Sequence, residues 1–500
     1  MTVEQLNVVL LVSAVVLLVA VVAVRLSVRT GLPSLLIYVG IGVLMGEDGL
    51  GVSFDDAQLA RLLGYAALVL ILAEGGLTTS WRAIRPSVPA AAVLATAGSI
   101  VSVLVTAAGA WLALGHDLGL ALLVAAIVSS TDAAAVFSVL RRVPLPPRIT
   151  GLLEAESGFN DAPIVILVVA FAEAETHGEG VPVLHLAGDL VYELALGAAV
   201  GLAVGRLGVE VLRRVALPAS GLYPIAVMAL AVGAYGAGAV LHASGFLATY
   251  LAALVLGNSH LPHRPATRGF AEGVAWMAQI GLFVMLGLLA TPHQLLPAIL
   301  PALVVAAVLL LVARPVSVLV SLVGFRTPLR DMAFMSWAGL RGAVPIVLAT
   351  IPVVDGVGRS RLLFNVVFVL VVLLTLLQGP TLPWVARRLG LVRPFEAREL
   401  DVDSSPLSTL GADLLQVKVP AGSLLHGVAV FELRLPRGAV ISLIVRDGRP
   451  LVPEPTTQLR HGDELLVVAA DGVRRPTEAR LRAVSRGGRL ATWRGEGGEE

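Results

Sequence analysis

A chain of 500 residues with 57% hydrophobic and only 14% charged residues is too apolar for a water-soluble protein, in which about a quarter of residues are charged. Its net charge of +1 argues against a nucleic-acid-binding protein, because neutralising phosphates needs a concentrated basic surface. The lack of cysteine excludes disulfides, thiolate metal sites and cysteine nucleophiles. The composition therefore indicates a membrane protein.

The first 390 residues contain about thirteen mostly apolar stretches of a length that suits a bilayer core of about 30 Å. The first lacks the basic residues and cleavage site of an export signal, so we expect it to be retained. The stretches lie at residues 6–24, 32–46, 59–78, 88–114, 118–140, 149–172, 187–212, 221–241, 244–258, 272–290, 294–322, 329–352 and 361–386.

Arginines gather in every second connection between these stretches, as basic residues do in cytoplasmic loops. With an odd number of spans, this alternation predicts an N-terminus outside the cell and a C-terminus in the cytoplasm. One outer connection, with Arg359 and Arg361 beside Asp355, departs from the pattern. The basic connections hold Arg25 and Arg29, Arg82 and Arg85, Arg141, Arg142 and Arg148, Arg213 and Arg214, Arg264 and Arg268, and Arg326 and Arg330.

The sixth span carries an unusual density of polar residues in the sequence LEAESGFNDAPIVIL. On a helix, Ser157 and Asp161 share one face, whereas Glu156 and Asn160 share a second face about 100° away. Asp161 lies about 18 Å along the helix from the preceding basic loop, near the bilayer midplane. A charge there costs at least about 2.5–3.5 kcal/mol, so these groups need polar partners or water. This favours a functional site over an interfacial helix end.

Two further spans are expected to be interrupted. AIVSSTDAAAVFSVL in the fifth span places Thr131 and Asp132 in mid-membrane among side chains that compete for backbone hydrogen bonds. AGLRGAVPI in the twelfth span places Gly339, Gly342 and a proline around Arg341. Interrupted helices at corresponding places in two halves are the sequence pointer to a transporter site. Tight helix packing is the alternative explanation for the glycines, and it leaves the charges unexplained.

Charge balance suggests roles for these groups. Arg341 cannot lose its proton at accessible pH, so it needs a carboxylate, and Glu156 is the expected partner. Asp161 and Asp132 then remain as exchangeable carboxylates. Burial disfavours the charged form of an acid, so a proton competes with a metal cation for the same oxygens.

The expected ligands are hard oxygens, which suit an alkali cation better than a transition metal: the two carboxylates, the Ser157 hydroxyl and the Thr131 carbonyl. Competition for one site, combined with alternating access, produces exchange rather than leak. These motifs do not indicate an enzyme, and no cofactor is expected.

The motifs STDAAAV, ESGFND and AGLRGAVPI, in that order, resemble those of the monovalent cation:proton antiporter family 1, in particular its bacterial NhaP-type Na+/H+ and K+/H+ exchangers. The resemblance covers roughly residues 6 to 390. It implies an all-α bundle of inverted repeats, with a dimerising interface domain and a core domain in which two unwound helices cross. The Asn-Asp pair resembles the electroneutral branch, in which a second aspartate at position 160 would suggest electrogenic exchange.

The resemblance also assigns site residues. Glu74 in ILAEGGL matches an acidic residue of the family's third span, with an interfacial position near Arg82 as the alternative, and Ala133 departs from the proline that often follows the Thr-Asp pair. The implied cation- and proton-binding residues are Asp161, Asn160, Asp132, Thr131, Ser157 and Glu74, and the implied structural ion pair is Glu156 with Arg341.

Other polar residues of the spans are expected to have lesser roles. Glu154 is expected near the cytoplasmic mouth. Gln279, Arg314, Asn365 and His242 are expected to form helix–helix hydrogen bonds or to extend toward the membrane surface rather than to touch the ion.

Beyond Arg393 the hydrophobicity falls and the apolar stretches shorten to strand length at 414–419, 439–445 and 464–470, which predicts a small soluble α/β domain. Its motifs GVAVFELRLP, RDGRPLVP and LRHGDELLVV resemble the TrkA-C domain of potassium-conductance regulators. The Gly-rich turn of a nucleotide-binding half is missing. The domain is expected to bind a regulatory small ligand or to dimerise, with simple stabilisation as the alternative.

The expected domains are an exchanger at 1–390, a linker at 391–411, a TrkA-C-like domain at 412–486 and a disordered tail at 487–500. We expect a homodimer in the bacterial cytoplasmic membrane that exchanges a monovalent cation for H+, with K+ favoured over Na+ by the accompanying domain. A cation channel would show a filter motif such as T-V-G-Y-G, and an intramembrane aspartyl protease would show a G-x-G-D motif. The sequence contains neither. Cation-coupled uptake of a solute stays open.

Overall fold

The computed structural model describes residues 3–30, 33–52, 54–132, 136, 145–178, 183–215, 217–392, 401–407, 412–470, 472–488 and 491. Ala133, the loop arginines at 141 and 142, parts of the expected linker and most of the expected tail lie outside these residues. The chain forms two compact units, Met1–Val392 and Arg393–Glu500.

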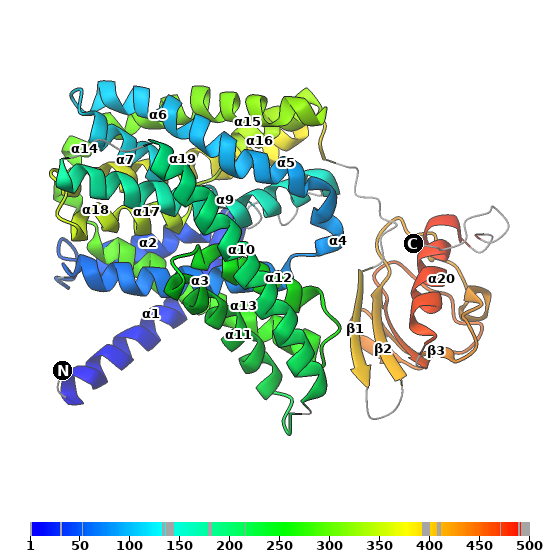
Figure 1. The fold of residues 1–500 in the computed structure, drawn as a ribbon. Coiled ribbons are helices and arrows are strands. Elements are labelled where there is room, and N and C mark those ends of the chain that lie inside the picture. The colour runs from blue at the N-terminus through cyan, green and yellow to red at the C-terminus, as the bar shows by residue number, and fades with distance from the viewer. Residues whose placement is uncertain are drawn as a thin grey trace. The chain divides into compact units, whose positions relative to one another are not determined.

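The first unit is a bundle of helices, several of them interrupted (Figure 1). π-helical turns at Leu94–Gly98 and Leu309–Ala313 join α5 to α6 and α14 to α15. The α-helices are α1 Val3–Thr30, α2 Ser34–Met45, α3 Ala57–Thr78, α4 Trp81–Ile84, α5 Val88–Val93, α6 Ser99–Ala113, α7 Leu118–Ser129, α9 Pro147–His177, α10 Val183–Arg214, α11 Leu222–Val240, α12 Gly245–Asn258, α13 Arg264–Leu289, α14 Leu296–Val308, α15 Arg314–Leu322, α16 Leu329–Trp337, α17 Ala343–Leu348, α18 Thr350–Val354 and α19 Ser360–Arg388.

Each of the predicted apolar stretches contains an apolar helix. Eight helices of the described residues are long and apolar enough to cross a membrane. The number of crossings stays a prediction, because the apolar helical segments in the other stretches are shorter: Val9–Arg25 within α1, Ser34–Met45, Leu118–Ser129, Gly245–Asn258 and Ala343–Val354.

Local sequence explains where several of these helices begin. The side chains of Asp56, Asp117 and Ser244 accept hydrogen bonds from backbone N–H groups three residues later and so cap α3, α7 and α12. Many large apolar side chains remain exposed, among them Leu11 and Leu18 of α1, each at 67%. Such outward-facing apolar surface fits lipid rather than water.

The helices of the first unit fall into two groups by their packing. We call α2, α3 and α10–α13 the scaffold group, because α12 and α13 each pack against α3, α13 packs against α2, and α10 and α11 pack against α12. We call α5–α7, α9 and α14–α19 the core group, in which α6 packs against α7 and α14, α7 against α9, and α14 against α19. The two broken spans both belong to the core group.

The described residues of the second unit form an antiparallel sheet in the order β1-β2-β5-β3-β4, with the helix α20. The three predicted strands are confirmed as β2 Ala412–Lys418, β3 Ala439–Arg446 and β5 Glu464–Ala470; β4 spans Arg449–Leu451 and α20 spans Arg474–Gly487. Alternating residues of β2 and β5, with Leu481 and Val484 of α20, form its core. The structure differs from the expected linker at β1, Asp401–Leu407, because this segment pairs with the edge of β2.

Candidate functional site

The two interrupted spans meet at their breaks, as the sequence predicts. α7 ends at Ser129 and is followed by extended residues, and α16 and α17 are separated by a non-helical stretch at residues 338–342. The backbone N–H of Asp132 donates to the carbonyl of Leu340 at 2.9 Å. The breaks therefore lie against each other and expose backbone groups to the surrounding side chains.

Gly342 is required at this crossing by space. A Cβ atom on Gly342 would lie 1.7 Å from Oδ2 and 2.9 Å from Cβ of Asp132, so the Asp132 side chain or the backbone beside it would have to move. This contact explains why the second break carries a glycine beside its arginine.

The polar face of α9 holds the first break in place. The Ser157 hydroxyl donates to the Thr131 carbonyl at 3.2 Å, and the amide of Asn160 donates to the Thr131 hydroxyl. The hydroxyl of Ser130 donates to Oδ1 of Asp161 at 2.7 Å. Sequence reasoning passed over Ser130, although it belongs to the polar run SSTD. The predicted coordinating groups are thus brought together at one place.

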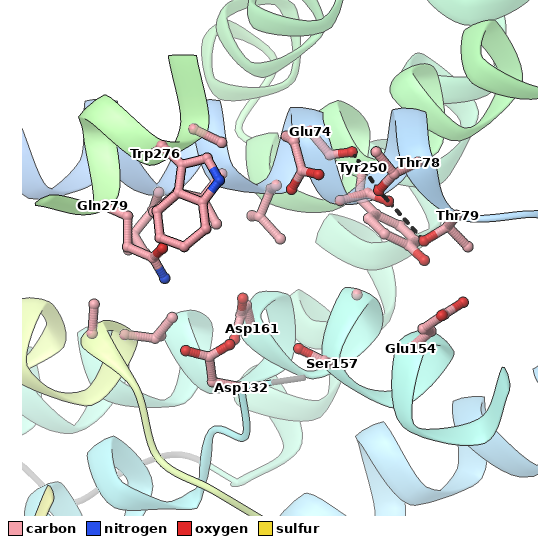
Figure 2. Close-up of a pocket in the computed structure, with 18 of the residues that line it drawn as sticks. Glu74, Thr78, Thr79, Asp132, Glu154, Ser157, Asp161, Tyr250, Trp276 and Gln279 are labelled. Carbon is pink, nitrogen blue, oxygen red and sulfur yellow. Dashed lines mark hydrogen bonds between the residues drawn. The ribbon is translucent and has the colours of Figure 1, made fainter. Parts of the chain in front are cut away.

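Asp161 and Ser157 line a cavity of about 410 Å³ between α9 on one side and α3 and α13 on the other (Figure 2). Thr131 and Asp132 also line it, whereas Glu156 and Asn160 are absent from its described lining. The predicted division of α9 into two faces is therefore present: one face meets the cavity and the other meets the protein interior.

Glu74 of α3 lies across the cavity from Asp161 (Figure 2). Glu154 and Gln279 line the same space, so Gln279 lies in the cavity lining rather than only between helices. Sequence reasoning missed Glu272 and Trp276, which reach the cavity from α13, and Tyr250, which reaches it from α12. Only Glu272 carried a signal, as a carboxylate at the edge of a span.

The predicted pairing of Glu156 with Arg341 is wrong. Glu156 is 2% exposed, and its carboxylate forms a bidentate ion pair with Arg314 of α15, with Nη2 to Oε2 at 2.9 Å. A planar guanidinium matches a carboxylate in this fork-like geometry. The Thr131 hydroxyl donates to the same carboxylate at 3.4 Å, which ties the pair to the first break.

Arg341 contacts backbone instead, although its Nε is buried without a hydrogen-bond partner among the described residues. It is 1% exposed, and its Nη1 donates to the carbonyls of Ser129 and Ser130 at 3.1 and 2.6 Å. These carbonyls lie at the C-terminal end of α7, where unpaired carbonyls and the helix dipole attract a cation. These two hydrogen bonds join the second break, which carries Arg341, to the first.

The arrangement offers oxygen ligands for a hard monovalent cation: carboxylates at 132 and 161, the Ser157 hydroxyl and backbone carbonyls. Within the described ranges, no group of three or more His, Asp or Glu side chains has the spacing to hold a metal ion. Hard oxygen ligands of this kind suit an alkali cation better than a transition metal.

Two protein families match this chain, one in each unit. The chain matches the family described as sodium/hydrogen exchanger, transmembrane, over residues 14–388, and the TrkA-C domain over residues 414–475. The K(+)/H(+) antiporter NhaP of Alkalimonas amylolytica is 38% identical over 93% of this chain and 82% of its own length. The K(+)/H(+) antiporter NhaP2 of Shewanella oneidensis is 36% identical over 94% and 83%, respectively.

A solved structure shares the fold. The sodium proton antiporter MjNhaP1 from Methanocaldococcus jannaschii matches with a TM-score of 0.64 at 20% identity, covering 75% of this chain and 99% of that chain. At this identity the likeness concerns the arrangement of helices alone.

Proposed function

Because the chain belongs to the transmembrane sodium/hydrogen exchanger family, we propose that it exchanges a monovalent cation for protons across the bacterial cytoplasmic membrane by alternating access. The observation that carries the proposal is the position of Asp161, a 6% exposed carboxylate that lines a cavity at the crossing of two broken helices. A cation and a proton neutralise the same carboxylate, so each displaces the other. Exchange results if the site becomes accessible from the opposite side of the membrane only when a cation or a proton is bound.

The surrounding groups divide into ligands and supports. Asp161, Asp132, Ser157 and Thr131 are proposed to coordinate the cation, and Glu74 to receive it from across the cavity. Asn160 supports the site from the other face of α9, because its amide donates to the Thr131 hydroxyl. Its amide carries no titratable proton, which supports electroneutral exchange of one cation for one proton at Asp161.

K+ is the favoured cation in this proposal. The NhaP relatives of Alkalimonas amylolytica and Shewanella oneidensis, which align over more than nine-tenths of this chain, are named K(+)/H(+) antiporters. A more distant relative, the Na(+)/H(+) antiporter NhaS2 of Synechocystis sp., is 27% identical over 65% of this chain and 62% of its own length, so Na+ is the alternative.

We further propose the assembly and orientation of the protein. The exposed apolar helices of the scaffold group and α1 are suited to a homodimer within the membrane. The alternation of basic connections supports an N-terminus outside and a TrkA-C domain in the cytoplasm, where it would bind a regulatory small ligand. The exchange would serve pH and cell-volume homeostasis.

The test is proton movement in proteoliposomes with an imposed pH gradient. Addition of K+ or Na+ is expected to dissipate the gradient in the wild type, and Asp161→Asn is expected to abolish that response. Asp331→Asn, a change at a carboxylate outside the cavity lining that pairs with Arg148, serves as a matched control. A wild type without cation-dependent proton movement would overturn the proposal, and clamping the membrane potential decides electroneutrality.

A further inference from the structure

The cavity beside Asp161 is buried at one end and open at the other. At its deep end, Leu68 of α3 and Ala343 of α17 are each 4% exposed. At the other end, Thr78 of α3 and Glu272 of α13 are exposed. Thr78 precedes the basic connection at residues 82–85, so the mouth faces the cytoplasm in the proposed topology.

Beyond its deep end, the cavity is followed by direct packing of α3 against α17 and α18. A Cβ atom on Gly64 would lie 2.8 Å from Cγ1 of Val347, so the backbone of α3 rests against that side chain. Gly64 is one helical turn from Leu68, on the side away from the mouth. The scaffold and core groups therefore touch here without space for an ion.

An ion pair lies at the outer edge of this contact. Nη1 of Arg61, at the start of α3, donates to Oδ1 of Asp355, which follows α18, at 3.0 Å. The pair joins a scaffold helix to a core segment. Across the described part of the chain, neither side chain has a second partner of opposite charge within ion-pairing distance.

The exposure of this pair suits a contact that opens and closes. The side chains of Arg61 and Asp355 are 27% and 33% exposed. Solvated ion pairs contribute little free energy, since water compensates both charges when they separate. The pair therefore orients the closed contact without locking it.

We propose that Arg61 and Asp355 form an outer latch, which closes the cavity on the side away from its mouth and separates once in each exchange cycle. The latch rests on the proposed alternating access, because Asp161 reaches the outside only if α3 parts from α17 and α18. When these segments part, the ion pair between Arg61 and Asp355 breaks. It forms again when the cavity reopens to the cytoplasm.

The natural absence of cysteine allows a direct test. In the double variant Arg61→Cys/Asp355→Cys the two new thiols are the only ones in the chain, and a short reducible bis-methanethiosulfonate reagent links them. Linking is expected to abolish cation-dependent proton movement in proteoliposomes, and reduction is expected to restore it. Linked protein that exchanges at the unlinked rate would overturn the latch.

A matched control links two positions within the core group. Arg359 donates to the carbonyl of Leu114 at 3.2 Å, and His116 lies two residues beyond. In the variant His116→Cys/Arg359→Cys, linking is expected to leave exchange unchanged. The single-cysteine variants treated with the same reagent show the effect of modification alone.

A charge swap keeps the test decisive if the double-cysteine variant is inactive before linking. Arg61→Asp places two carboxylates together and is expected to weaken the apparent affinity for a cation supplied from the cytoplasmic side, by about two- to five-fold. Adding Asp355→Arg is expected to restore it, and failure of this rescue overturns the latch. Wild-type protein without any exchange would instead overturn the proposed function.

Discussion

At the scale of single residues, the partner of Glu156 is the feature most open to measurement. Removing one member of a buried ion pair leaves an uncompensated charge and costs about 3–5 kcal/mol. Arg314→Gln is therefore expected to lower the free energy of unfolding strongly. Adding Glu156→Gln is expected to recover most of the loss, because both members of the pair are then neutral.

The arginine at 341 provides the matched comparison. Arg341 donates to backbone carbonyls, so Arg341→Gln combined with Glu156→Gln is expected to show a much smaller coupling energy than the pair with Arg314. Thermal unfolding of the single and double variants in detergent measures both cycles. Equal coupling to the two arginines would contradict the assignment of the ion pair.

At the scale of the element, the crossing of the two breaks depends on the lack of a side chain at 342. Gly342→Ala is expected to reduce exchange at least about ten-fold, because its Cβ would collide with the Asp132 carboxylate and open the crossing. Gly281→Ala on α13 is the control, since nothing lies within 4 Å of its added Cβ. Exchange is measured in proteoliposomes. Correct folding is checked by the elution of the purified protein in size-exclusion chromatography. An active Gly342→Ala variant would show that the breaks tolerate separation.

The elements themselves were largely predictable from sequence. Long apolar runs give spans because a bilayer requires them, and the breaks were found because Thr131, Asp132 and the two glycines of AGLRG all weaken a helix. The two faces of α9 followed from helical period alone. Such local patterns determine whether a segment forms a helix, where the helix breaks and which residues share a face, independently of distant segments.

The partners across helices were less predictable. Both Arg314 and Arg341 lie within apolar spans, and spacing along one helix does not say which distant carboxylate each one meets. The π turn Leu309–Ala313 directly precedes Arg314 and inserts an extra residue, so it rotates the following helix relative to a regular α-helical period. Its sequence LLLVA carries no signal of that turn. Tyr250 and Trp276 were missed for a similar reason, since aromatic residues in a span normally indicate packing.

At the scale of the whole molecule, the second unit has its own buried electrostatic support. Nε and Nη2 of Arg446 donate to the fully buried Asp463 carboxylate at 2.9 and 2.8 Å, and the backbone N–H of Arg460 donates at 2.8 Å. Burial alone would raise the pKa of Asp463, but these hydrogen bonds and the arginine charges outweigh it and lower the pKa. The unit is therefore expected to hold this stability above the unfolded-state pKa of about 3.9 and to lose it as pH falls through the lower folded-state value.

Asp463→Asn tests this dependence. The variant loses charge-assisted hydrogen bonds worth about 1.5–3 kcal/mol, so its second unit is expected to be less stable at neutral pH and less sensitive to acid. Hydrogen exchange of the β5 amides in the full chain, corrected for the intrinsic effect of pH, measures both effects. Unchanged protection at neutral pH would contradict the role given to the pair.

Each unit has stabilising interactions of its own, so the contribution of the second unit to exchange can be tested by removing it. Every described residue that lines the cavity lies in the first unit, and so do both members of the outer latch. A chain that ends at Val392 is therefore expected to retain cation-dependent proton movement and the effect of Asp161→Asn, while any response to a regulatory ligand is lost. Proteoliposome assays of the shortened and full chains, compared at equal reconstituted amounts, measure this directly. A shortened chain that elutes as a folded protein and yet moves no protons would show that the second unit takes part in the cycle itself.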